Sequence, residues 1–208
     1  MGVKSTLKTL FPSVHRRFAL ARVYLRDGFL KERWNTYYDG VVKVPERCLE
    51  ELKPRIPDHI DTFLNLGCGA GREFQTFDGE MKLWGIDIVP PSRIRWVKPF
   101  KNLTYEQCSV EDLTKRLERR EHDLTHTLIY SSGVLMYVSP EGQKRFYDAC
   151  LASGCRNFIF QEYAPGNTKH PFNTFEIPQR DFEVIPFRSH KGEGQPVAYV
   201  RLEQKAYA

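Results

Sequence analysis

The chain has 208 residues, 41% of them hydrophobic and 27% charged, as is usual for a globular protein with its own core. No stretch approaches the roughly 20 consecutive apolar residues of a membrane-spanning helix, and the N-terminus lacks the apolar core of a secretory signal. The five cysteines are odd in number and show no zinc-site spacing, so we expect reduced thiols, no bound metal and a cytoplasmic protein.

The formal net charge of +5 is concentrated in the first 36 residues. These residues carry eight basic and two acidic side chains, a net +6, which leaves −1 for the other 172 residues. A nucleic-acid substrate would require an excess of positive charge on the body of the protein. The near-neutral body therefore argues against RNA or DNA as a partner.

Residues 1–43 are interpreted as a basic amphipathic helical segment ahead of the main domain. Its apolar side chains recur in steps of three and four along one stripe: Leu7, Leu10, Phe11, Val14, Phe18, Ala21, Leu25 and Phe29. The stripe can pack against the body of the protein. Alternatively, residues 4–33 can lie on an anionic membrane or an acidic protein partner, which would make a cytoplasmic protein membrane-associated. A nucleic-acid contact is the third alternative, but no aromatic residues are interleaved as a stacking platform.

Residues 44–208 are predicted to form one domain in which strands and helices alternate. In chain order, we expect a helix over 44–53, a strand over 62–66, a helix over 72–77, strands over 82–88 and 103–108, a helix over 110–119, a strand over 125–131, a helix over 140–151 and a strand over 157–161. This alternation predicts an α/β protein with a Rossmann-like, doubly wound, mainly parallel sheet and helices on both faces.

The pattern changes after residue 163. Residues 164–178 are rich in Pro, Gly, Asn and Thr and are predicted to form a loop. Two strands then follow, over 182–188 and 196–203, joined by a glycine-rich turn. We expect this C-terminal hairpin to add antiparallel strands to the edge of the sheet.

Three glycines, Gly67, Gly69 and Gly71, follow the predicted strand 62–66 in the stretch FLNLGCGAGREF. A loop without Cβ atoms at the carboxyl end of a parallel strand lets a ligand approach the backbone closely. Asp87 ends the next strand, 16 residues after Gly71. An acidic side chain there accepts hydrogen bonds from the two hydroxyls of a ribose, so the combination indicates a cofactor that carries adenosine.

The spacing of the glycines argues against a dinucleotide cofactor. A dinucleotide fingerprint would need a sixth-position glycine where this chain has Arg72. The chain resembles the class I S-adenosylmethionine-dependent methyltransferases in four stretches, LNLGCGAGR (64–72), WGIDIVP (84–90), CSVEDL (108–113) and LIYSSGVLMYVSP (128–140). They cover roughly residues 60–163 in the order of that family.

The resemblance implies that S-adenosyl-L-methionine is the cofactor and that matching positions bind it. The glycines would cradle the methionine part, Asp87 would hold the ribose, Ile88 would pack on the adenine, and residues 109–111 would border the adenine ring. The implied cofactor-binding residues are Asn65, Gly67, Cys68, Gly69, Gly71, Asp87, Ile88, Ser109, Val110, Glu111, Ser131 and Ser132.

Three positions depart from the family pattern. Asn65 stands where members usually have an acidic residue that meets the cofactor's ammonium group. Members often have an acidic residue near Ser109, whereas the acidic residues here are Glu111 and Asp112. Tyr137 stands where many members have a histidine.

The candidate acceptor bases are Glu162 at the end of the fifth strand, His170 in the following loop, and Tyr137. None belongs to a recognisable catalytic pair, and Glu162 as a plain structural carboxylate is an equal alternative. The stretch after the fourth strand reads SSGV rather than the PPY-type motif of nucleic-acid amine methylation. We therefore expect O- or N-methylation of a small molecule or of a sugar or glycan. The competing hypotheses are a catalytically inactive, cofactor-binding partner or scaffold protein, and a nucleotide-dependent oxidoreductase.

Overall fold

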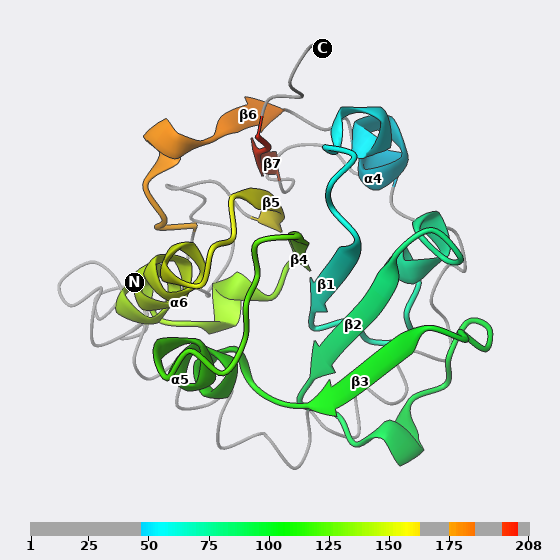
Figure 1. Cartoon of the computed structure of the whole chain (residues 1–208). Helices are drawn as coiled ribbons and strands as arrows, with labels where there is room; N and C mark the ends of the chain where they lie inside the picture. Colours follow the sequence, from blue (N-terminus) through cyan, green and yellow to red (C-terminus); the bar gives the residue numbers. More distant parts are fainter. Residues whose placement is uncertain (1–46, 163–174, 186–196, 204–208) are drawn as a thin grey trace, which may run out of the picture.

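The computed structural model describes residues 47–162, 175–185 and 197–203. These residues build a seven-stranded sheet in the order β3-β2-β1-β4-β5-β7-β6 (Figure 1). The strands are β1 (Thr62–Leu66), β2 (Lys82–Asp87), β3 (Leu103–Gln107), β4 (Thr127–Ser132), β5 (Asn157–Glu162), β6 (Glu183–Ile185) and β7 (Val197–Arg201). The α/β class and the parallel order of the first five strands are as predicted.

The central strand β1 pairs in parallel with β2 on one side and with β4 on the other. At its carboxyl end Leu66 is level with Ile86 of β2 and Ser131 of β4. Since the carboxyl ends of parallel strands share one edge of the sheet, the segments that follow β1, β2 and β4 meet there.

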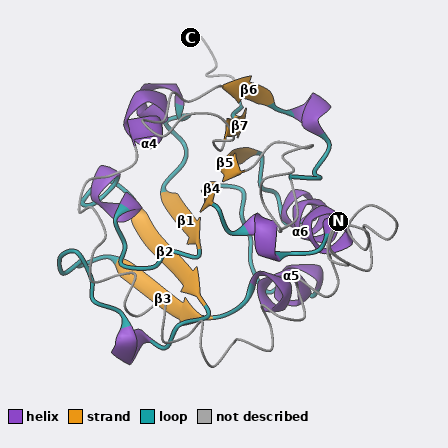
Figure 2. Cartoon of the chain, turned by 180° about the vertical axis from the view of Figure 1, so that it is seen from behind, coloured by secondary structure: helices purple, strands orange, loops and turns teal. Residues whose placement is uncertain are grey.

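Helices cover both faces of the sheet, as predicted. Helices α5 (Val110–Glu118) and α6 (Pro140–Ala152) lie side by side against one face, and α4 (Arg47–Leu52) lies on the other side of the sheet, as Figure 2 shows from behind. The period-two alternation of strand side chains fills both layers. In β1, Leu64 and Leu66 join the core under α5 and α6, whereas Phe63 joins the core under α4.

The C-terminal hairpin is confirmed. Strand β7 runs antiparallel between β5 and β6, with Phe160 opposite Tyr199 and Val184 opposite the same residue on the other side. Tyr199 also stacks on Phe175 with ring centroids 4.1 Å apart, which ties the hairpin to the core. β6 begins at Glu183, one residue later than predicted, and β7 ends at Arg201, two residues earlier than predicted. Residues 186–196, which include the end of the first predicted strand and the predicted glycine-rich turn, lie outside the described residues.

The predicted helix over 72–77 is shorter than expected and is not an α-helix. The structure has a four-residue 3-10 helix there, η3 (Glu73–Thr76), followed by a turn in which Gly79 has φ +83°. The left-handed conformation of Gly79 helps the chain to turn back toward β2. The predicted amphipathic segment over 1–43 and residues 164–174 of the predicted loop over 164–178 lie outside the described residues. None of the helices within the described ranges is long and apolar enough to cross a membrane.

Candidate cofactor site

The glycine loop leaves β1 through three residues with positive φ: +61° at Gly67, +49° at Gly69 and +77° at Gly71. L-residues avoid this region, so the sequence pattern follows directly from the backbone. Gly67 is exposed at the carboxyl edge of the sheet. A Cβ on Gly67 would lie 2.4 Å from Cγ2 of Val134, so the segment after β4 packs directly on the first glycine.

The interior of the loop is anchored to β2. The backbone N–H of Cys68 donates to the carbonyl of Ile86 at 3.0 Å. The Cys68 side chain is buried and packs on Gly85, where an added Cβ would lie 2.7 Å from the sulfur. Burial, reinforced by the nearby Asp87 and Glu73, raises the pKa of the Cys68 thiol well above its usual value. Cys68 can therefore contact a cofactor through its backbone, while its side chain belongs to the core.

Asp87 lies where the sequence places it, at the tip of β2 beside the glycine loop. Its Oδ2 accepts the backbone N–H of Gly69 at 3.0 Å, and its Oδ1 accepts that of Val89 at 3.0 Å. Burial raises the pKa of Asp87, and these backbone donors oppose that shift. A carboxylate has about four lone-pair sites, so Asp87 keeps acceptor capacity beyond its backbone donors, which also include Ile88. That is what the two hydroxyls of a ribose require.

Ile88, next to Asp87, is 51% exposed. Large aliphatic side chains are seldom so exposed in the described part of the chain, where Val184 at 47% is the other case. An apolar side chain beside a ribose-binding carboxylate offers a surface for a flat aromatic ring. Its placement therefore fits the predicted adenine contact.

The end of β3 contributes Ser109, Val110 and Glu111. Ser109 caps α5, since its Oγ accepts the N–H of Asp112 at 3.1 Å. The Val110 side chain is buried in the core and Glu111 is exposed. Val110 can therefore border a ligand only through its backbone.

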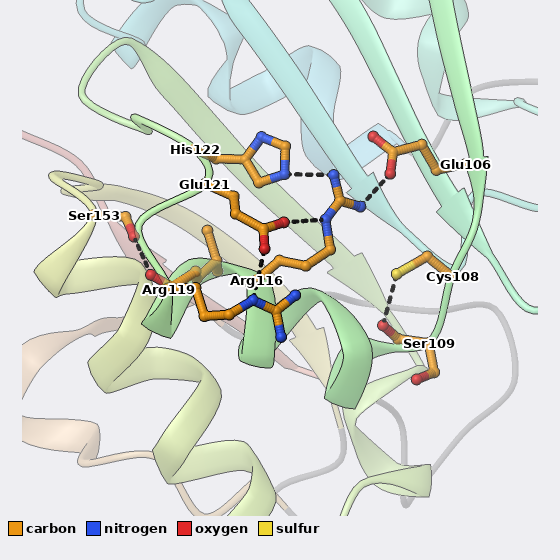
Figure 3. Close-up of polar contacts among 9 residues, drawn as sticks. Glu106, Cys108, Ser109, Arg116, Arg119, Glu121, His122 and Ser153 are labelled. Carbon is orange, nitrogen blue, oxygen red and sulfur yellow. Dashed lines mark hydrogen bonds and ion pairs between the residues drawn. The ribbon is translucent and has the colours of Figure 1, made fainter.

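The position of this strand end is fixed by a charged cluster around Arg116 of α5 (Figure 3). Arg116 binds Glu106 of β3, Glu121 at 3.2 Å and His122 Nε2 at 2.6 Å. Burial, and then the charge of Arg116, lower the pKa of His122. Because a guanidinium can only donate, His122 Nε2 is the acceptor in this contact. The cluster ties α5 to β3 next to Cys108 and Ser109.

The ends of β4 and β5 are joined by Glu162. Its Oε1 accepts from Ser131 Oγ at 2.5 Å and from the backbone N–H groups of Val134 at 3.1 Å and Leu135 at 3.0 Å. Its Oε2 is buried and has no hydrogen-bond partner within the described part of the chain. Burial raises the pKa of Glu162 to about 7, against the opposing effect of these donors. Glu162 therefore holds the segment that packs on Gly67.

The structure brings most of the sequence-predicted residues to one edge of the sheet, around the glycine loop and Asp87. Ser132 is half-buried at the tip of β4, and Tyr137 is half-buried in the 3-10 helix η5 (Leu135–Tyr137). His170 lies outside the described residues. Within the described ranges, no group of His, Cys, Asp or Glu side chains is arranged to hold a metal ion.

Sequence reasoning missed two residues at this edge. Val134 packs on Gly67, and no local pattern marks it. Glu73 is 7% exposed, and its Oε2 lies 3.5 Å from Nδ2 of Asn65. Its position directly after the glycine loop was a signal that could have been used.

Comparisons with known proteins agree with the architecture. No protein-family model and no curated protein matches the sequence. Among solved structures, the bifunctional kinase-methyltransferase WbdD aligns with a TM-score of 0.58 at 15% identity, over 80% of this chain and 41% of that one. A SAM-dependent methyltransferase from Anabaena variabilis aligns with a TM-score of 0.52 at 11% identity, over 83% of this chain and 91% of that one.

The chain has the class I methyltransferase fold. The alignment with the Anabaena protein extends over nearly all of that protein, so the match is to a whole methyltransferase-fold domain and not to a fragment of one. This chain spans only about two fifths of the length of WbdD. In this methyltransferase fold, the glycine loop and Asp87 lie at the carboxyl ends of β1 and β2, on the ligand-binding edge of an open parallel sheet.

Proposed function

We propose that the protein is an S-adenosylmethionine-dependent methyltransferase that acts on a small molecule or a sugar or glycan acceptor. The observation that carries the proposal is the arrangement at one edge of the methyltransferase fold. Three glycines in the left-handed region, a carboxylate with spare acceptor capacity at Asp87 and an exposed apolar surface at Ile88 lie next to one another.

These residues fit the parts of the cofactor. The exposed Gly67 leaves room for the methionine part, Asp87 matches the ribose hydroxyls and Ile88 matches the adenine. When bound, S-adenosylmethionine supplies a methyl group already activated on sulfur. The protein then has to hold the acceptor in line with the sulfonium and exclude water.

The acceptor base remains a choice among three side chains. Glu162 is committed to Ser131 and to the backbone after β4, which favours a positioning role over contact with an acceptor. Tyr137 follows on η5, two residues beyond Leu135, one of the Glu162-bound positions. An amine acceptor would need only to be neutral, whereas a hydroxyl acceptor would need one of these residues or His170 as a base.

The test combines binding with transfer. Asp87→Asn should weaken S-adenosylhomocysteine binding by about 1–3 kcal/mol, because the ribose loses a charged acceptor. Asp61→Asn is the matched control, since Asp61 is exposed at the opposite end of β1. Equal affinity of the Asp87 variant and the wild-type protein, measured by calorimetry, would refute the ribose assignment.

Transfer is then measured with S-adenosylmethionine labelled on its methyl group and a panel of sugars, amines and hydroxyl compounds. Incorporation by the wild-type protein and its loss in Asp87→Asn would establish the enzyme. Tight binding without transfer to any acceptor would instead favour an inactive, cofactor-binding partner protein.

A further inference from the structure

We propose that Glu73 is the carboxylate that recognises the α-ammonium group in the methionine part of the cofactor. The inference rests on the proposed function and assigns a ligand-binding role to a residue outside the motifs. Glu73 belongs to η3, which begins two residues after Gly71.

The geometry places this carboxylate at the base of the glycine loop. Asn65 lies two residues before the first glycine, and Glu73 lies two residues after the last. Glu73 Oε2 is 3.5 Å from Asn65 Nδ2, so the two side chains meet where the loop leaves β1 and enters η3. Both residues are buried, with 2% exposure at Asn65 and 7% at Glu73.

The two oxygens of Glu73 have different surroundings. Oε1 accepts from Arg72 Nε at 2.8 Å and from Arg72 Nη2 at 2.5 Å. Oε2 has only the long Asn65 contact within the described part of the chain. Because a carboxylate oxygen accepts about two hydrogen bonds, Oε2 retains the capacity for a strong, charged donor.

The cofactor supplies such a donor. Its α-ammonium loses water when the methionine part settles on the glycine loop, and a buried ammonium needs an anionic acceptor. Two other buried carboxylates lie near this edge of the sheet. Asp87 is engaged by Gly69 and Val89 at the ribose end, and Glu162 is engaged by Ser131 and the segment after β4. Glu73 is the one that flanks the loop itself.

Arg72 completes the match. Its guanidinium is paired with Glu73, and its side chain is 24% exposed. The positive side chain of Arg72 complements the α-carboxylate of the methionine part, and the negative side chain of Glu73 complements its α-ammonium group. Asn65, which is neutral, can then orient Glu73 without adding a second negative charge.

The experiment compares three ligands on Glu73→Gln by calorimetry. S-Adenosylhomocysteine carries both charged groups, its decarboxylated analogue keeps only the ammonium, and 5′-methylthioadenosine lacks both. The expected loss is about tenfold or more for the first two ligands, because a charged hydrogen bond is removed. We expect less than about a twofold change for 5′-methylthioadenosine, and Glu80→Gln, at an exposed site after η3, is the control for all three.

The outcomes separate this inference from the proposed function. An equal loss for all three ligands would show that Glu73 only shapes the loop, and no loss for any would also overturn the inference. A wild-type protein that binds none of them would overturn the proposed function and this inference together. If Glu73→Gln does not fold, Glu73→Asp keeps the charge at a shorter reach and should show the same ligand selectivity with a smaller loss.

Discussion

Glu162 is a fully buried carboxylate whose two oxygens differ in their hydrogen bonding. Oε1 accepts hydrogen bonds from Ser131 Oγ and from the backbone N–H groups of Val134 and Leu135, whereas Oε2 has no hydrogen-bond partner among the described residues. Burial raises its pKa to about 7 from an unfolded value near 4.5. Since the folded state holds the proton more tightly, protonation stabilises the fold fully below about pH 4.5, and this stabilisation is lost as the pH rises through about 7.

Glu162→Gln removes this titration. The unfolding free energy of the wild-type protein, relative to the variant, should fall by roughly 3 kcal/mol between about pH 4.5 and about pH 7.5. Chemical denaturation of both proteins at several pH values measures this difference, and other titrating groups cancel between them. A difference that does not change with pH would contradict the raised pKa of Glu162.

Site residues could be predicted from the sequence where a short local pattern marks them. The glycines and Asp87 could be identified because a turn geometry and a strand end are both local features. The sequence identified Glu162 as a candidate site residue but could not predict its hydrogen-bond partners. Ser131 and Leu135 are 31 and 27 residues away along the chain. Such pairings depend on strand order, which no local pattern encodes.

At the scale of elements, the glycine loop and the segment after β4 are built to fit one another. The φ of +61° at Gly67 disfavours any L-residue, and Val134 fills the space that a Cβ would need. Gly79 provides a matched comparison, because its φ is +83° but nothing lies within 4 Å of an added Cβ. A substitution at Gly79 therefore tests backbone strain alone, whereas a substitution at Gly67 tests backbone strain together with the steric clash with Val134.

Gly79→Ala should reduce the free energy of unfolding by roughly 1–2 kcal/mol, the cost of a left-handed L-residue. Gly67→Ala should cost more than Gly79→Ala, by about 1–3 kcal/mol for overpacking. In the double variant Gly67→Ala/Val134→Ala both Cγ atoms are gone, and the nearest remaining atom, the Val134 Cβ, lies 3.5 Å away. The double variant should therefore be more stable than the sum of the single effects, and simple additivity in denaturant titrations would contradict this fit.

Strands were predicted better than short helices. Each of the seven strands in the described part of the chain overlaps a predicted strand. Apart from the end of β6 that borders residues 186–196, their ends differ from the predicted ends by at most two residues. The helix predicted over 72–77 is present only as the shorter 3-10 helix η3, because the short return from β1 to β2 leaves room only for η3 and its turn. Tertiary constraints on length override propensity in such connections.

For the whole molecule, the uneven charge is the feature that the fold does not explain. The first 36 residues carry +6 and the rest of the chain −1. We expect the full-length protein to bind vesicles that contain phosphatidylserine and not neutral vesicles, with affinity falling as salt rises. A variant without residues 1–33 should lose vesicle binding and keep its affinity for S-adenosylhomocysteine. Loss of the folded state in that variant would instead show that the segment packs on the body.

The central claim is that the edge formed by Gly67–Gly71 and Asp87 binds a sulfur-linked adenosine cofactor. Calorimetric titration of the full-length protein with S-adenosylmethionine, S-adenosylhomocysteine and NAD tests it most directly. We expect saturable binding of both sulfur compounds and no binding of NAD. Binding of NAD in their place would favour a nucleotide-dependent oxidoreductase, and binding of none of the three would contradict the cofactor assignment and the methyltransferase proposal that depends on it.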